Sequence, residues 1–151
     1  MTTALRTDSN NTDFVNLVKQ LDAYLAKLDG KEHAFYNKLN TIDSLKHVVV
    51  IHENNKAVGC GAMREILPET MEIKRMYTTP ENRGKGIAKT VLKELETWAK
   101  EEGCKVCRLE TGKRQPEAIA LYQKCGYRRI PNYGKYVGIN NSVCFEKMLN
   151  Q

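Results

Sequence analysis

The stretch ENRGKGIAKT, residues 81–90, places two glycines and three cationic side chains where a helix is expected to begin. Glycine loses more conformational freedom on folding than other residues, so Gly84 and Gly86 indicate a backbone that must approach another group closely. Positive charge beside them favours a negative partner. The cationic residues are Arg83, Lys85 and Lys89. The stretch therefore predicts an anion site at the N-terminus of a helix.

The residues on either side of this stretch predict a strand, a turn and a long helix. The strand is expected to end near Thr78, before Pro80, and the helix follows Gly86. This order directs several backbone N–H groups toward one place, which phosphate commonly occupies. The Walker A motif needs glycine where Ala88 stands, and the dinucleotide motif needs its third glycine at Lys89, so neither fits. A glycine-containing loop that only starts a helix is the alternative interpretation.

The length and composition are those of one globular domain. The chain has 151 residues and a mass of 17.2 kDa, enough to bury a core without disulfides or metals. Hydrophobic residues make up 41% and charged residues 28%. No apolar run approaches the ~20 residues of a membrane span, and residues 1–11 are polar and lack the order of a signal peptide. We therefore expect a single domain over residues 1–151, located in the cytoplasm, with no membrane partner.

Five cysteines form an odd set, which favours reduced thiols in a chain without an export signal. Cys104 and Cys107 form a C-x-x-C, the spacing of half a zinc site or of a redox pair. No second C-x-x-C or H-x-x-x-H accompanies it. Buried, unreactive cysteines are therefore the preferred interpretation, and no metal is expected.

The net charge of +6 and the pI of about 9.1 favour an anionic partner. Charge alone does not choose among nucleic acid, a membrane surface and a small polyanion. The basic residues are spread along the chain, with no aromatic-interleaved RNA motif and no basic amphipathic helix. We therefore expect no nucleic-acid partner; DNA binding is an alternative that a steep salt dependence would reveal.

Hydrophobic spacing and turn residues divide the chain into helices and strands. The expected helices cover residues 12–29, 86–102 and 116–125. Strands are expected on both sides of a turn at 53–56, and at 71–77, 105–111, 126–130 and 142–149. Residues 31–45 predict one or two short helical turns. The order of helix, antiparallel hairpins and then alternating strands and helices predicts an α/β fold, a mixed sheet flanked by helices.

The pattern R-x-x-G-x-A, formed by Arg83, Gly86 and Ala88, resembles the pyrophosphate loop of the GNAT superfamily of acetyl-CoA-dependent N-acyltransferases. RMYTTPENRGKGIA and PEAIALYQKCGY resemble the central strand, loop and helix start of that family and the helix and strand that follow. The ordered set extends over residues 46–149. EIKRMY, LETG and SVCFEKML are similar to small single-domain bacterial GNAT proteins. The resemblance implies an N-acetyltransferase with a mixed sheet in which two neighbouring parallel strands splay apart.

The resemblance implies that acetyl-CoA is the cosubstrate and lies where the strands at 71–78 and 105–111 separate. The pantetheine arm would pair with the backbone of the first strand, and amides of the loop would hold the pyrophosphate. A side chain at Gly86 would collide with that pyrophosphate. Family members often have asparagine three residues before the helix alanine, and Gln115 stands there with a longer reach. The implied cofactor-binding residues are Met76, Tyr77, Thr78, Arg83, Gly84, Lys85, Gly86, Ile87, Ala88, Lys89, Gln115 and Tyr122.

Direct acetyl transfer needs an amine with a free lone pair, yet an alkylamine is protonated near neutral pH. Glu72, on the strand before the loop, is the first candidate for the general base, directly or through water, and Glu110 is the second. The alternative places Glu72 on a solvated strand face, paired with Lys74 or Arg75. Tyr122 stands where the family commonly has the acid that protonates the leaving thiolate; a core tyrosine is its alternative role.

The acceptor is expected to be an amine of a small molecule or peptide. Its pocket would come from residues 12–45 and 131–141, which carry no diagnostic motif. Tyr133, Lys135 and Tyr136 suit a polar or anionic acceptor, or are ordinary loop residues. The basic charge disfavours polycationic acceptors. A non-catalytic acyl-CoA-binding sensor is a further alternative, and the chain is expected to be a monomer or a homodimer that pairs through its last strands.

Overall fold

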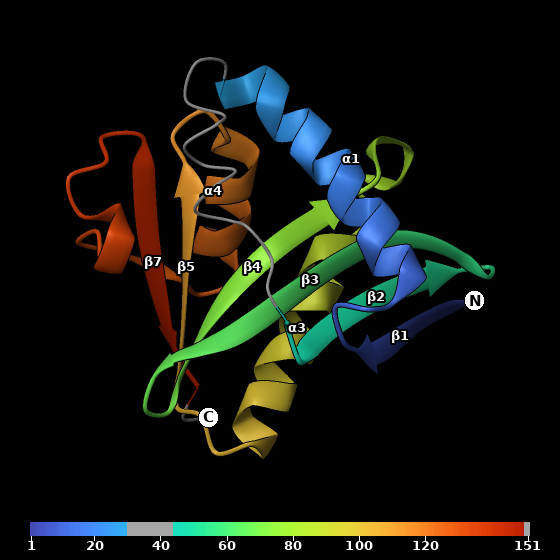
Figure 1. The fold of residues 1–151 in the computed structure, drawn as a ribbon, viewed down its shortest axis with the longest axis horizontal. Coiled ribbons are helices and arrows are strands. Elements are labelled where there is room, and N and C mark those ends of the chain that lie inside the picture. Colours follow the sequence, from blue (N-terminus) through green and yellow to red (C-terminus); the bar gives the residue numbers. More distant parts are fainter. Residues whose placement is uncertain (30–43, 150–151) are drawn as a thin grey trace.

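Seven strands form one sheet in the computed structural model, which describes residues 1–29 and 44–149. The order across the sheet is β1-β2-β3-β4-β5-β7-β6 (Figure 1). The strands are β1 (Thr2–Thr7), β2 (His47–Glu53), β3 (Lys56–Leu67), β4 (Thr70–Thr78), β5 (Val106–Gly112), β6 (Arg128–Ile130) and β7 (Ser142–Met148). The α-helices of the described residues are α1 (Thr12–Asp29), α3 (Ile87–Glu101) and α4 (Pro116–Lys124), and 3₁₀ turns cover Pro80–Asn82 and Gly134–Tyr136.

Neighbouring strands of the sheet pair antiparallel, except β4 and β5, which run parallel. A parallel pair needs a long crossover connection, and α3 lies in the segment that joins β4 to β5. The expected α/β fold with a mixed sheet flanked by helices is confirmed.

The helices cover opposite faces of the sheet (Figure 1). On one face, Phe14 of α1 packs in a cluster with Val48 and Val50 of β2. On the other face, Val49 and Ile51 belong to the cluster that α3 and α4 complete. Successive side chains of a strand point to opposite faces, so the apolar run of β2 is buried on both. Burying one such side chain contributes roughly 1.5–3 kcal/mol.

Two glycines of β3 bring α3 close to the sheet. A Cβ on Gly59 would lie 2.5 Å from Cγ2 of Ile87, and a Cβ on Gly61 would lie 2.6 Å from Cγ1 of Val91 and 3.1 Å from Cδ1 of Leu95. Real Cβ atoms do not approach side chains so closely, so only glycine permits this packing. The N-terminus of α3 is thereby fixed beside the end of β4.

A bulge in β4 separates it from β5. Opposite Gly61, β4 has two residues, Arg75 and Met76, because Cys60 pairs with Tyr77 and Ala62 pairs with Lys74. Arg75 adopts a φ of +57°, in the left-handed region. Bulges bend the strand that carries them. Pairing between β4 and β5 ends at Ile73 and Leu109, which confirms the splay that the resemblance implied.

The structure adds one strand to those expected from the sequence. Thr2–Thr7 forms β1, which pairs antiparallel with β2 at the edge of the sheet. Its side chains are mostly exposed, so it lacks the apolar alternation that identifies a half-buried strand. The helical turns expected at residues 31–45 lie almost entirely outside the described residues.

Candidate active site

A cavity of about 470 Å³ opens where β4 leaves β5, between the N-terminal halves of α3 and α4. The glycine loop forms one end, with Gly84 at φ +80° and Gly86 at φ +83°. Among the described residues, no atom lies within 4 Å of a Cβ placed on either glycine. Both conformations favour glycine, and the open space beside them leaves the loop backbone accessible to a ligand.

The amides of this loop are donors without acceptors among the residues described. The first hydrogen bond of α3 runs from the Thr90 amide to the Gly86 carbonyl oxygen at 3.1 Å. The preceding N–H groups of a helix have no partner inside it, so those of Ile87, Ala88 and Lys89 point outward beside those of Gly84 to Gly86. The loop and helix start can therefore accept a phosphate group.

Of the three loop cations, Arg83 and Lys89 line the cavity. Nε of Arg83 donates to the carbonyl oxygen of Thr78 at 3.1 Å, and its guanidinium lies 4.9 Å from the ring centre of Tyr24. The ammonium of Lys85 instead donates to Oδ1 of Asn82 at 3.0 Å and lies 3.7 Å from Glu53. Lys85 contributes its backbone to the loop, while its side chain points toward Glu53.

The wall of the cavity consists of the free part of β4 and residues of the helices α1, α3 and α4. Met76, Tyr77 and Thr78 line it from β4, past the point where β4 pairs with β5. An extended ligand could therefore take up the strand edge that β5 leaves unpaired. Sequence reasoning missed Tyr24 of α1 and Asn82, a buried residue whose side chain donates to Oγ1 of Thr79 at 2.8 Å.

Tyr122 and Gln115 lie where this cavity meets a second one of about 90 Å³. Tyr122 is 6% exposed and contacts Phe145 and Tyr127 with ring centres 6.3 and 6.1 Å away. Burial and the nearby Glu110 carboxylate raise the pKa of Tyr122. Its hydroxyl therefore stays protonated at neutral pH and can act as a donor toward either cavity.

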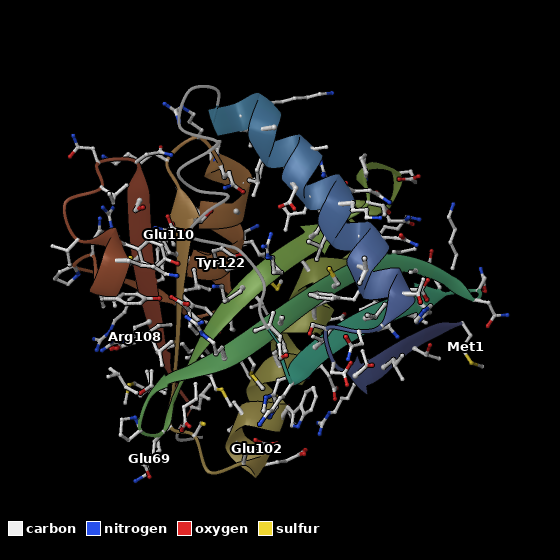
Figure 2. All side chains as sticks on the ribbon, in the orientation of Figure 1. Met1, Glu69, Glu102, Arg108, Glu110 and Tyr122 are labelled. Atoms are coloured by element: carbon white, nitrogen blue, oxygen red, sulfur yellow. The ribbon has the colours of Figure 1, made fainter. Side chains whose placement is uncertain are left out.

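The two candidate carboxylates have different surroundings. Glu110 lines the small cavity, and its Oε2 accepts from Ser142 Oγ at 2.7 Å. Figure 2 shows Glu110 beside Tyr122 near the ends of β5 and α4. Glu72 is 3% exposed rather than on a solvated strand face, and its Oε2 accepts from Tyr133 Oη at 2.6 Å. The structure thus brings Glu110 and Tyr122 together and pairs Glu72 with Tyr133.

Two residues of the small cavity, Lys74 and Arg75, were not foreseen as site residues. Lys74 and Arg75 come from the bulged part of β4, and Asn141 comes from the loop before β7. Both segments suggested for the acceptor pocket contribute to this cavity, through Leu21 of α1 and through Tyr136 and Asn141. The bulge that directs Lys74 and Arg75 has no sequence signal, since neither residue is glycine.

No group of three metal-ligating side chains occurs among residues 1–29 and 44–149. All five cysteines are free, and burial raises the pKa of Cys60 and of Cys107 to about 12. Their thiols are therefore protonated and unreactive. Within the same residues, no helix is long and apolar enough to cross a membrane.

The chain belongs to the acetyltransferase (GNAT) family, whose model matches residues 14–127. Over 137 residues it is 33% identical to the IAA acetyltransferase of Azospirillum brasilense, and this match covers 89% of this chain and 90% of that protein. A provisionally assigned acyl-CoA N-acyltransferase of Klebsiella pneumoniae is 32% identical, with a TM-score of 0.84 over 99% of this chain and 98% of that one. The PaiA N-acetyltransferase of Thermoplasma acidophilum, solved with coenzyme A, shares the fold at 18% identity, with a TM-score of 0.69 over 98% and 99% of the two chains. Family membership supports acyl transfer as the activity.

Proposed function

We propose that this protein transfers an acetyl group from acetyl-CoA to the amino group of a small molecule or peptide. One observation carries the proposal: a cavity under the glycine loop meets a smaller cavity that holds Glu110, and Tyr122 stands at the junction. A thioester donor and an amine acceptor entering from the two sides would meet at this tyrosine. The coenzyme A bound by the Thermoplasma acidophilum protein supports the choice of donor.

The loop and the free edge of β4 would hold acetyl-CoA. Amides from Gly84 to Lys89 suit the pyrophosphate, because they form a concave set of donors at a helix N-terminus. Backbone groups of Met76 to Thr78 suit the amides of the pantetheine arm. Gln115 lines both cavities, and it would contact the arm near its thioester end.

Glu110 is the general base that the geometry favours, in place of Glu72. It lines the small cavity next to Tyr122, whereas Glu72 is held by Tyr133 and does not line that cavity. Glu110 would take a proton from the acceptor's ammonium, directly or through one water. The freed lone pair then forms the nitrogen–carbon bond to the acetyl group, and the carbon–sulfur bond breaks.

Tyr122 would act at the sulfur that leaves. Its raised pKa keeps the hydroxyl protonated, so it can donate to the thiolate of coenzyme A as negative charge develops there. The same burial that raises its pKa holds the ring against Phe145 and Tyr127, which fixes the direction of the hydroxyl.

Calorimetric titration of the full chain with acetyl-CoA, coenzyme A and ATP tests whether acetyl-CoA is the cosubstrate. One-to-one binding of acetyl-CoA that ATP does not reproduce supports it. Absence of heat, together with an unchanged melting temperature, would refute it. Binding without turnover of any amine in a broad panel would favour an acyl-CoA-binding sensor.

We also propose a single catalytic domain over residues 1–151 and a cytoplasmic location. Five free cysteines are typical of a reducing compartment. Of the last strands, β6 forms the edge of the sheet and β7 lies next to it, and a homodimer would pair there.

A further inference from the structure

The small cavity holds hydrogen-bond donors that lack an acceptor. Nε of Arg75 and Nδ2 of Asn141 are both buried, and neither has a hydrogen-bond partner within the described part of the chain. Both residues line the cavity. Buried donors in folded proteins are nearly always paired. Two unpaired donors on one cavity therefore indicate a ligand that brings oxygen acceptors.

Arg75 is fixed from the far end of its side chain. Its side chain is 5% exposed, and Nη1 donates to Oδ1 of Asp22 on α1 at 2.9 Å. Its backbone is in the left-handed region at the bulge, a conformation that non-glycine residues adopt infrequently. The bulge and α1 together hold the guanidinium in place, and Nε has no hydrogen-bond partner among the described residues.

Asn141 is oriented by a backbone group. Its Oδ1 accepts from the amide of Lys113 at 3.2 Å, which determines the direction of its Nδ2 group. A Cβ on Gly112 would lie 3.1 Å from Nδ2. Glycine at this position therefore leaves room for the amide side chain.

Lys74 adds a positive charge to the same wall. Its side chain is 7% exposed and lines the cavity, with Nζ 4.0 Å from Oε1 of Glu72. Burial lowers the pKa of Lys74 to about 8; Lys135, Arg64 and Arg75 act in the same direction, and Glu72 opposes them. An anion bound here would relieve the repulsion among these cations.

Negative charge lies on the side of the cavity near Tyr122, where the reaction is proposed to occur. Glu110 lines the cavity and is close enough to Tyr122 to raise the pKa of that residue. The cavity thus presents a carboxylate beside Tyr122 and cationic or amide donors elsewhere on its wall. Its volume of about 90 Å³ is several times the ~10–15 Å³ that one ordered water needs. A small zwitterion matches both the charges and the size.

We propose that the acceptor is a free amino acid or a similarly short amino carboxylic acid. Its carboxylate lies against Lys74, Arg75 and Asn141, and its amino group faces Glu110. This assignment rests on the proposed function and names the class of substrate for the same site. Ordered water on the two unpaired donors is the competing explanation, and it would give no preference for a carboxylate.

The test begins with calorimetry of acetyl-CoA on the full chain, followed by release of free thiol in the presence of acceptors. The acceptors are the common amino acids, β-alanine and γ-aminobutyrate, each beside its carboxamide, which keeps the amine and removes the negative charge. We expect kcat/KM for at least one acid to exceed that of its amide by about 100-fold or more, since a site built to pair a buried group rejects an analogue that lacks it.

Asn141→Asp sharpens the test, because it keeps an oxygen for Lys113 and replaces the donor with a negative charge. We expect at least ~100-fold loss of kcat/KM for the acid, with the acetyl-CoA affinity and the turnover of the amide retained. Asn140→Asp is the matched control, since it makes the same charge change at the exposed neighbouring position, and it should retain activity.

The outcomes separate the two proposals. Absence of acetyl-CoA binding removes the proposed function and this inference with it. Acetyl-CoA binding with amides used as well as acids, or with no turnover of either class, overturns the inference and leaves the cofactor assignment standing. Equal losses for acid and amide in Asn141→Asp would also overturn it, because they indicate structural damage to the site.

Discussion

The Tyr133 hydroxyl donates a 2.6 Å hydrogen bond to Oε2 of Glu72, whereas Glu110 lines the small cavity together with Tyr122. The two acidic residues that the sequence suggested as general bases therefore have different surroundings and are suited to different roles. Glu72 stands between Tyr133 and the ammonium of Lys74, 4.0 Å away. Glu110 stands beside Tyr122 at the junction of the cavities.

Replacing each acid by its amide should distinguish these roles. We expect Glu110→Gln to lower kcat by about 10²–10⁴-fold, the range of a lost general base. Glu72→Gln should change kcat much less, because its carboxylate is already engaged by Tyr133 and Lys74. Steady-state kinetics with a fixed amine acceptor provide the measurement. A larger kcat loss in Glu72→Gln than in Glu110→Gln would identify Glu72 as the general base instead.

Removing the hydroxyl of Tyr122 should affect chemistry and leave cofactor binding intact. The ring of Tyr122→Phe keeps its contacts with Phe145 and Tyr127, so stability should change little. We expect kcat to fall by about 10²-fold or more, because the leaving thiolate loses its donor. Calorimetry with acetyl-CoA serves as the control. Unchanged kcat would assign Tyr122 a packing role alone.

A side chain on Gly86 should block the phosphate-binding loop. The position requires φ +83° and faces open space, so alanine costs on the order of 1–2 kcal/mol of stability through backbone strain. Gly86→Glu adds bulk and negative charge where the pyrophosphate is expected, and acetyl-CoA binding should become undetectable by calorimetry. A melting curve for both variants separates strain from lost binding. Retained affinity in Gly86→Glu would exclude this loop as the pyrophosphate site.

The close packing of α3 on β3 should not tolerate a larger residue. A Cβ on Gly61 would lie 2.6 Å from both Sδ of Met76 and Cγ1 of Val91. We expect Gly61→Val to destabilise the fold by about 1–3 kcal/mol, the usual cost of overpacking a core. Urea denaturation measures the loss of stability. Gly103→Ala is the comparison, because Gly103 has a φ of +87° and its Cβ would meet no atom of the described residues within 4 Å, so alanine there adds strain without crowding. Equal stability of wild type and Gly61→Val would contradict the packing described here.

The buried ammonium of Lys74 should make stability depend on pH in a defined direction. Its pKa is lowered from 10.5 to about 8, so the folded state binds this proton less tightly than the unfolded state does. The resulting penalty is fully present below pH 8 and is relieved as the pH rises from about 8 toward 10.5. The free energy of unfolding of the wild type, relative to Lys74→Met, should therefore increase over that interval. A relative stability that stays constant or falls there would contradict the burial of a charged Lys74.

Local patterns in the sequence were sufficient for most elements. The alternation and length of apolar runs predicted α1, α3, α4 and the strands from β2 to β7, because burial against a sheet imposes periods that a sequence shows directly. Strand β1 was not predicted, because an exposed edge strand has no such period. The pairing register of the strands could not be predicted in the same way. The bulge at Arg75 depends on how β3 and β4 align, and no residue type signals it.

The sequence by itself determined the glycine loop that we propose binds the pyrophosphate, since Gly84 and Gly86 at a helix start carry their conformational requirement wherever the chain folds. It also named Tyr122, Glu110 and Glu72 as site residues with the help of family resemblance, and it ranked Glu72 before Glu110 as the general base. Only the tertiary structure decided which carboxylate shares a cavity with Tyr122, and that Lys74, Arg75 and Asn141 belong to the same cavity. These groups come from separate strands and loops, so their proximity arises from the splay of β4 from β5, a long-range property that no local pattern contains.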